Sequence, residues 1–94
     1  MDDEGRAGPA PATIDLLYFA WVRERIGQGR ERVETRAGTV AELVEELRGR
    51  EARYVLALGD MGAVRVALDQ ELAGMDASLA GVREVAFFPP MTGG

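Results

Sequence analysis

The stretch that most constrains the fold is residues 39–49, TVAELVEELRG, which predicts one capped amphipathic helix. Thr39 followed by Glu42 forms a capping box, in which both side chains accept hydrogen bonds from free amides at the helix start. Four apolar residues then follow the helical spacing i, i+3, i+4, i+7, and Gly49 ends the helix. They are Val40, Leu43, Val44 and Leu47. A partner-binding helix is the alternative, but on so small a domain a single stripe is usually core, so a second layer must cover it.

Short segments rich in strand-forming residues can supply that layer. They are residues 14–19, 31–36, 64–68, 71–73 and 85–88. We expect one helical turn at residues 23–27 and a turn or connector around residues 54–58. The resulting order is strand, strand, helix, strand, short strand, strand. It predicts an α+β fold of the β-grasp (ubiquitin-like) type, with a mixed sheet packed on one main helix.

The domain organisation follows from the glycine and proline content at the start of the 94-residue chain. Residues 1–13 are small, acidic and rich in Gly and Pro, so we expect a disordered N-terminal tail. Residues 14–94 then form one β-grasp domain with an extended C-terminal Gly-Gly tail. The acidic start lacks an apolar signal core and no apolar run approaches a membrane span, which predicts a cytoplasmic protein without membrane contact.

The composition narrows the chemistry that the chain can perform. It has no Cys, no His and no Lys, so its 11 basic residues are all Arg. Thiolate nucleophiles, imidazole bases and Schiff bases are therefore excluded, and we expect no bound metal. Asp, Glu, Ser and Tyr keep catalysis open, but we do not expect a stand-alone enzyme. The net charge of −5 argues against a nucleic-acid partner.

The chain ends in FFPPMTGG, residues 87–94, and this ending points to the terminal carboxylate of Gly94 as the reactive group. Pro89 and Pro90 have no amide donors, so strand pairing must stop at Phe88. The tail Met91, Thr92, Gly93 and Gly94 can reach about 13 Å beyond the sheet. Two glycines keep that tail thin enough to enter a narrow tunnel on another protein. The alternative is a frayed end that carries no function.

Strand alternation predicts where a partner would bind. If Val85 and Phe87 face the helix, then Leu17, Phe19 and Phe88 form an exposed apolar patch beside the tail. Pro89 and Pro90 continue this surface. Arg23 and Trp21 border it. The alternative is that loops cover the patch.

Two motifs resemble a known family. Residues 17–24, LYFAWVRE, resemble the LFFA-x-VRE opening of the small subunit of molybdopterin synthase, and residues 84–94 resemble its EVAFFPP-x-x-GG ending. The likeness covers nearly all of residues 14–94. The entry into the last strand differs from the family's D-G-D-E-V, because the glycine at Gly81 is moved by one. A diglycine ending alone also fits the sulfur carrier of the thiazole (thiamine) pathway and ubiquitin-like protein modifiers, which remain alternatives beside a plain interaction module.

The resemblance implies a function as a sulfur carrier without bound cofactor. An E1-like adenylating enzyme would use ATP to activate the Gly94 carboxylate, and a sulfur donor would convert it to a thiocarboxylate, 1-thioglycine. The chain would then dock on the large synthase subunit and pass sulfur to cyclic pyranopterin monophosphate, which forms the dithiolene of molybdopterin. Two sulfurs per product suit a heterotetramer with two carriers. The catalytic groups would belong to the large subunit.

Overall fold

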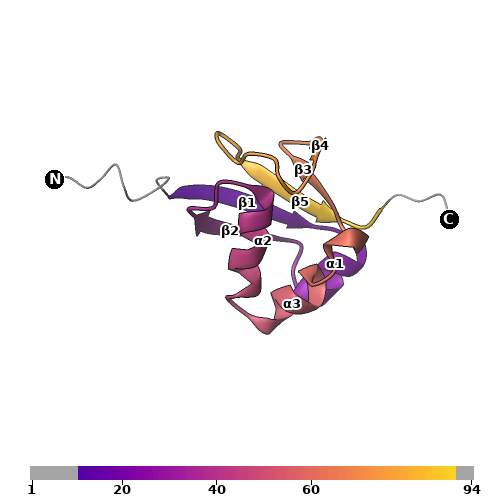
Figure 1. Cartoon of the computed structure of the whole chain (residues 1–94). Helices are drawn as coiled ribbons and strands as arrows, with labels where there is room; N and C mark the ends of the chain where they lie inside the picture. Colours follow the sequence, from indigo (N-terminus) through magenta and orange to yellow (C-terminus); the bar gives the residue numbers. More distant parts are fainter. Residues whose placement is uncertain (1–10, 91–94) are drawn as a thin grey trace.

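The computed structural model, which describes residues 11–90, is built on a five-stranded mixed sheet with the strand order β2-β1-β5-β3-β4 (Figure 1). The strands are β1 (Ala12–Tyr18), β2 (Arg30–Thr35), β3 (Arg65–Leu68), β4 (Glu71–Ala73) and β5 (Glu84–Phe88). The last strand, β5, lies in the middle, parallel to β1 and antiparallel to β3. The predicted β-grasp arrangement is confirmed.

The main helix is α2 (Val40–Arg48), and its ends form as the sequence predicts. The Thr39 hydroxyl accepts a hydrogen bond of 3.2 Å from the Glu42 amide, and the Glu42 carboxylate accepts one of 2.7 Å from the Gly38 amide. These two bonds satisfy amides that have no partner within the helix. All four residues of the predicted apolar stripe are buried. The stripe is therefore core.

Two further helices flank α2, and one of them corrects an expectation. The helical turn predicted before Gly27 is α1 (Ala20–Ile26), and Gly27 ends it with a φ of 99°, which suits glycine. Residues 54–58, expected as a turn or connector, belong to α3 (Ala52–Leu58). Tyr54, Ala57 and Leu58 face the core at helical spacing. A single 3₁₀ turn at Met61–Ala63 then leads into β3.

The boundary of the folded unit also differs by two residues. β1 begins at Ala12, whereas we expected the first strand at Ile14, because Ala12 and Thr13 pair with Thr35 and Glu34 of β2. Residues 1–10, where most of the predicted disordered tail falls, lie outside the described residues.

All three helices lie on one side of the sheet (Figure 1). On this inner face the side chains of β1 and β5 are fully covered. They are Ile14, Leu16, Tyr18, Val85 and Phe87. The rings of Tyr18 and Phe87, which are register partners in the parallel pair, stack with centroids 5.9 Å apart. In residues 11–90 no helix lies across the opposite, outer face of the sheet.

Candidate functional site

The outer face of β1 and β5 holds the predicted apolar patch. Val85 and Phe87 are both 0% exposed, so the condition on which the patch prediction rested is met. Leu17 pairs in register with Ala86 on the outer face, and Leu17 is half-buried. Phe19, just beyond the end of β1, is 48% exposed. Alternation along two neighbouring strands therefore leaves apolar side chains uncovered on the outer face.

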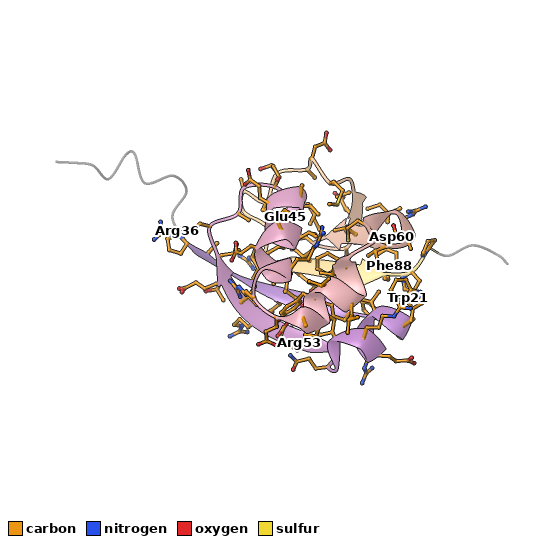
Figure 2. All side chains as sticks on the ribbon, turned by 60° about the horizontal axis from the view of Figure 1, so that its bottom comes forward. Trp21, Arg36, Glu45, Arg53, Asp60 and Phe88 are labelled. Carbon is orange, nitrogen blue, oxygen red and sulfur yellow. The ribbon has the colours of Figure 1, made fainter. Side chains whose placement is uncertain are left out.

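A hollow of about 440 Å³ lies at the point where β5 ends. It is lined by Phe19, Ala20, Ala86, Phe88, Pro89 and Pro90. We call it the tail-side hollow. Four of the six predicted partner-binding residues line it, and its lining is apolar throughout. Figure 2 shows Phe88 at the end of the molecule opposite to Arg36. The hollow is open to solvent, and an exposed apolar surface of this kind usually marks a partner site.

The backbone between β1 and α1 directs Phe19 toward this hollow. The Phe19 amide donates to the carbonyl of Phe87 at 3.1 Å, which extends the pairing with β5 by one residue. Ala20 then adopts a φ of 52°, in the left-handed region that disfavours residues with a Cβ. The chain reverses there into α1, in which the amides of Val22 and Arg23 donate to the carbonyl of Phe19. The conformation of Ala20 thus ends the strand and leaves the Phe19 ring at the surface.

A second exposed apolar side chain lies at the far edge of the sheet, separated from Leu17 by two buried alanines. Leu17, Ala86, Ala67 and Leu72 are successive register partners across β1, β5, β3 and β4. We call these four residues the outer-face row. Leu72 is 76% exposed on the edge strand. Sequence reasoning missed the contributions of Ala67 and Leu72, because the pairing of β3 with β5 brings them beside the tail only in the folded chain.

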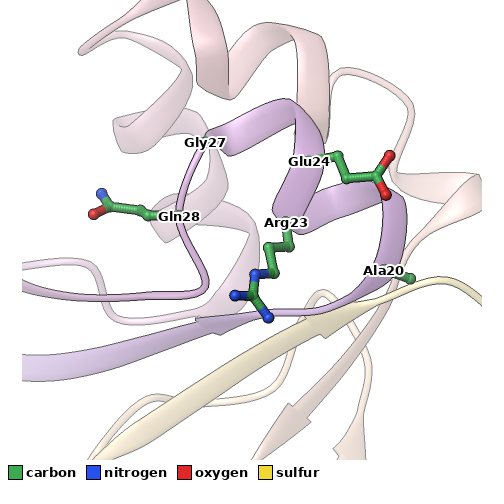
Figure 3. A pocket seen from close by; sticks show the side chains of 5 residues that line it. All are labelled: Ala20, Arg23, Glu24, Gly27 and Gln28. Carbon is green, nitrogen blue, oxygen red and sulfur yellow. The ribbon is translucent and has the colours of Figure 1, made fainter.

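Arg23, predicted to border the patch, lines a neighbouring hollow instead of the tail-side hollow (Figure 3). The neighbouring hollow has a volume of about 610 Å³ and includes Ala20, Glu24 and Gln28. The two hollows share Ala20. The Arg23 side chain lies against Gly29, where a Cβ would approach its Nε to 3.1 Å. Arg23 is therefore next to the patch but on its α1 side.

Trp21, the other predicted border residue, packs partly against the core. The guanidinium of Arg25 lies 4.4 Å from the centre of the Trp21 ring, a cation–π contact. Trp21 does not line the tail-side hollow.

A polar cluster centred on Glu31 lies on the inner side of β1 and β2, and sequence reasoning did not find it. The hydroxyls of Tyr18 and Tyr54 donate to one oxygen of the Glu31 carboxylate at 2.7 and 2.6 Å. Gln28 donates to the other oxygen at 2.8 Å, and Arg53 approaches that oxygen at 3.3 Å. We call these five residues the Glu31 cluster. It joins β1, β2 and α3.

The cluster perturbs the acidity of its members. Burial alone raises the pKa of Glu31, but the hydrogen bonds from Tyr54 and Tyr18 and the charge of Arg53 outweigh it, so the pKa of Glu31 lies below its usual range. Burial and then the hydrogen bond to Glu31 raise the pKa of Tyr54 to about 12. The same two causes raise the pKa of Tyr18 strongly. Both phenols therefore stay neutral and donate their hydrogen bonds. The cluster holds β1, β2 and α3 together on the side of the sheet away from the tail-side hollow.

The predicted reactive tail, Met91, Thr92, Gly93 and Gly94, lies outside the described residues. Within residues 11–90, no group of three or more acidic, His or Cys side chains is placed to hold a metal ion. None of the helices in this part of the chain has the length and apolar character needed to cross a membrane.

Comparison with known proteins identifies the family of this chain. Residues 16–94 match the ThiS family. The chain is 41% identical over 81 residues to the molybdopterin synthase sulfur carrier subunit of Escherichia coli strain K12, which covers 86% of this chain and 99% of that protein. The match therefore includes both the strands that build the tail-side hollow and the residues beyond them.

Two solved structures share the fold. SAMP1 of Haloferax volcanii superposes with a TM-score of 0.69 at 27% identity, over 88% of this chain and all of that one. A complex of subunits 1 and 2 of the molybdopterin-converting factor of Helicobacter pylori contains a chain with a TM-score of 0.55 at 21% identity, which covers 88% of this chain and 100% of that chain. The second likeness is evidence for the fold alone.

Proposed function

We propose, because this chain belongs to the ThiS family, that it acts in molybdenum cofactor biosynthesis as the sulfur carrier subunit of a molybdopterin synthase. The observation that carries this proposal is the match to the Escherichia coli carrier subunit over 99% of that protein's length. The family match runs through Gly94 and so includes the diglycine that would hold the sulfur.

The reactive group in this proposal is the carboxylate of Gly94. An adenylating enzyme joins it to the AMP part of ATP and releases pyrophosphate. A sulfur donor then displaces AMP and leaves a thiocarboxylate. This species is a sulfur nucleophile at neutral pH, and it needs no cysteine, which suits a chain that has none. The sulfur passes to cyclic pyranopterin monophosphate in a site on the large subunit.

The surface that docks on the large subunit is the tail-side hollow together with the outer-face row. Its described residues are apolar, so this surface can bind but supplies no acid or base. Leu17, Phe19 and Phe88 provide large apolar side chains at the base of the tail, and Leu72 extends the contact to the sheet edge. Docking there would aim residues 91–94 at the partner. The catalytic side chains belong to the large subunit.

Deletion of Gly94 tests the proposal directly. It moves the reactive carbon back by one residue, about 3.5 Å, and a misplacement on this scale costs orders of magnitude in rate. We expect sulfur transfer to fall below detection. The melting temperature should stay unchanged, because β5 ends at Phe88, before the deleted residue.

The readout is the intact mass after incubation with the adenylating enzyme, ATP and a sulfur donor. Full-length chain should gain about 16 Da, the replacement of one oxygen by sulfur. A reaction without ATP is the matched control and should show no gain. A full-length chain that never gains this mass, or a deletion variant that still delivers sulfur, would contradict the carrier function.

The likeness to SAMP1, a small archaeal modifier protein, favours one second candidate. A protein modifier would use the same activated carboxylate to acylate lysines of other proteins. Mass spectrometry of the products separates the two functions. A modifier leaves its C-terminus joined through Gly94 to lysines of other proteins, and a tryptic digest shows this as a branch of residues 84–94, because Arg83 is the last basic residue. A carrier leaves its sulfur in the pterin product and regains a carboxylate.

A further inference from the structure

Charged residues are distributed unevenly on the outer face of the sheet. Toward the start of β5 one row of this face holds two carboxylates and one arginine, namely Asp15 and its register partners Glu84 and Arg32. Beyond them, toward the tail, only two charged side chains occur in the cross-strand rows of residues 11–90. They are Arg30, the register partner of Leu17, and Arg65, the register partner of Phe88. We call these two residues the arginine bracket.

Neither arginine is fully neutralised by the described part of the chain. Arg30 shares the carboxylate of Asp15 with Arg32, at 3.1 and 2.9 Å, so two cations face one anion. These hydrogen bonds hold the pKa of Asp15 below its usual range. Arg65 is exposed on β3, and within residues 11–90 no carboxylate lies within ion-pair distance of it. The tail half of this face is therefore positive.

This local charge is opposite to that of the whole protein, whose net charge is −5. An acidic protein repels an acidic partner at long range, and a positive patch around the contact point reverses that effect locally. Charges at the rim of an interface change the association rate and its salt dependence more than they change the contact energy. The bracket lies on the two strands that flank β1 and β5, with Arg30 on β2 beside Leu17 and Arg65 on β3 beside Phe88, and this is the position of an interface rim.

We infer that the large subunit presents an apolar centre flanked by carboxylates, which meet Arg65 and Arg30 when it docks on the tail-side hollow. This inference rests on the proposed function for the identity of the partner. The apolar centre fills the hollow and holds the complex. The carboxylates steer the approach and fix the register of the tail. Arg65 contributes the larger part of this steering, because it lies beside Phe88 and, within residues 11–90, does not share an anion.

The test is the kinetics of binding between the full chain, without sulfur, and the large subunit. Rates are measured at about 50 mM and about 500 mM salt, where screening lengths differ roughly threefold. The variant Arg65→Glu should lower the association rate constant about tenfold at low salt and by less than about twofold at high salt. Arg30→Gln should give a smaller loss of the same kind. Dissociation rates should change less than association rates.

Two controls separate local charge from other causes. Arg36→Glu makes the same change of net charge at the end of the molecule opposite to Phe88 (Figure 2), and it should slow association far less than Arg65→Glu. Arg65→Met removes the charge but keeps an apolar stem of similar length, so the packing of that stem is retained. Its association rate should therefore depend less on salt than that of the wild type.

The outcomes distinguish this inference from the function on which it rests. Equal effects of Arg65→Glu and Arg36→Glu would overturn the inference, because net charge alone would then explain the rates. Tight binding that is indifferent to salt and to Arg65→Glu would overturn it as well, and would leave the sulfur carrier function standing. A chain that gains sulfur in the mass test but does not bind the large subunit would refute the choice of partner, and the inference with it.

Discussion

Phe87 and Phe88 are neighbours in the chain, yet they lie on opposite faces of the sheet and have opposite surroundings. Phe87 is 0% exposed and stacks on Tyr18 beneath the helices. Phe88 lines a hollow that no helix of the described chain covers. The same alternation separates Leu16 from Leu17 on β1. One pair of strands therefore supplies the core with one set of residues and an apolar outer surface with the other.

Because the two faces differ in this way, we expect substitutions to alter stability and partner binding separately. Residues of the inner face are held from all sides, so their loss leaves a cavity. Residues of the outer face have already lost part of their contact with water in the free chain, and they gain the rest only when a partner covers them. Substitutions on the inner face should therefore be assessed by the free energy of unfolding, and substitutions on the outer face by the affinity for the partner.

The largest effect is expected for Phe87→Ala. Truncation of a buried Phe costs about 3–5 kcal/mol, which is a large fraction of the stability of a small domain. Chemical denaturation followed by circular dichroism measures the loss. Phe87→Leu, which keeps most of the volume, is the control and should cost clearly less. A loss below about 1 kcal/mol for Phe87→Ala would show that the inner face is not the close-packed side.

The next effect is on binding, for Phe88→Ser. A side chain at the centre of an interface contributes about 2 kcal/mol or more, so affinity for the large subunit should fall about 30-fold. The free energy of unfolding should change less than the affinity does, since Phe88 is only half-buried. Leu56→Ser is the matched control, because Leu56 is 67% exposed on α3, away from the hollow. Calorimetry that finds equal losses of affinity for the two variants would remove the distinction between the faces.

The smallest effect concerns the Glu31 cluster on the inner side. Glu31→Gln removes a carboxylate that accepts several hydrogen bonds and should cost about 1–2 kcal/mol at pH 7. The pKa of Glu31 in the folded chain lies below that in the unfolded chain, so its ionisation stabilises the fold above the unfolded value of about 4.3 and the benefit is lost as pH falls through the folded pKa. The difference between wild type and variant should therefore shrink at a pH of about 3.

Urea denaturation at both pH values checks this. The control is Glu45→Gln, an exposed carboxylate that pairs with Arg48 on α2 and should change stability little at either pH. A Glu31→Gln penalty that stays constant between pH 7 and pH 3 would show that the charge of Glu31 does not stabilise the cluster.

Most of the fold could be predicted from the sequence, because the local signals for helix and strand ends agree with the packing of the folded chain. The capping box at Thr39, the stripe after it and the prolines after Phe88 each define an element boundary by a local mechanism. The segment that became α3 could not be assigned, because Val55 and Leu56 are apolar although they face solvent. Their side chains hide the helical spacing of Tyr54, Ala57 and Leu58, and a short apolar run fits several structures.

The residues of the candidate site also fall into a group that local signals predict and a group that only the folded chain brings together. Alternation within one strand was enough to place Phe19 and Phe88 on the outer face. Leu72 and Arg65 could not be found in advance, since their places beside the tail depend on the register between β3 and β5, which no local signal specifies. The Glu31 cluster likewise depends on α3, whose Tyr54 lies 23 residues from Glu31.

The central position of β5 also determines how the protein responds to mechanical force. If a partner draws the tail into a tunnel, the pull acts along β5, which is hydrogen-bonded to β1 on one side and to β3 on the other. Such a pull loads both ladders in shear, so many hydrogen bonds must break together, whereas an edge strand peeled sideways would lose them one at a time. Slippage would also drag Val85 and Phe87 out of the core. The strand directly before the tail is therefore held by the sheet on both of its sides.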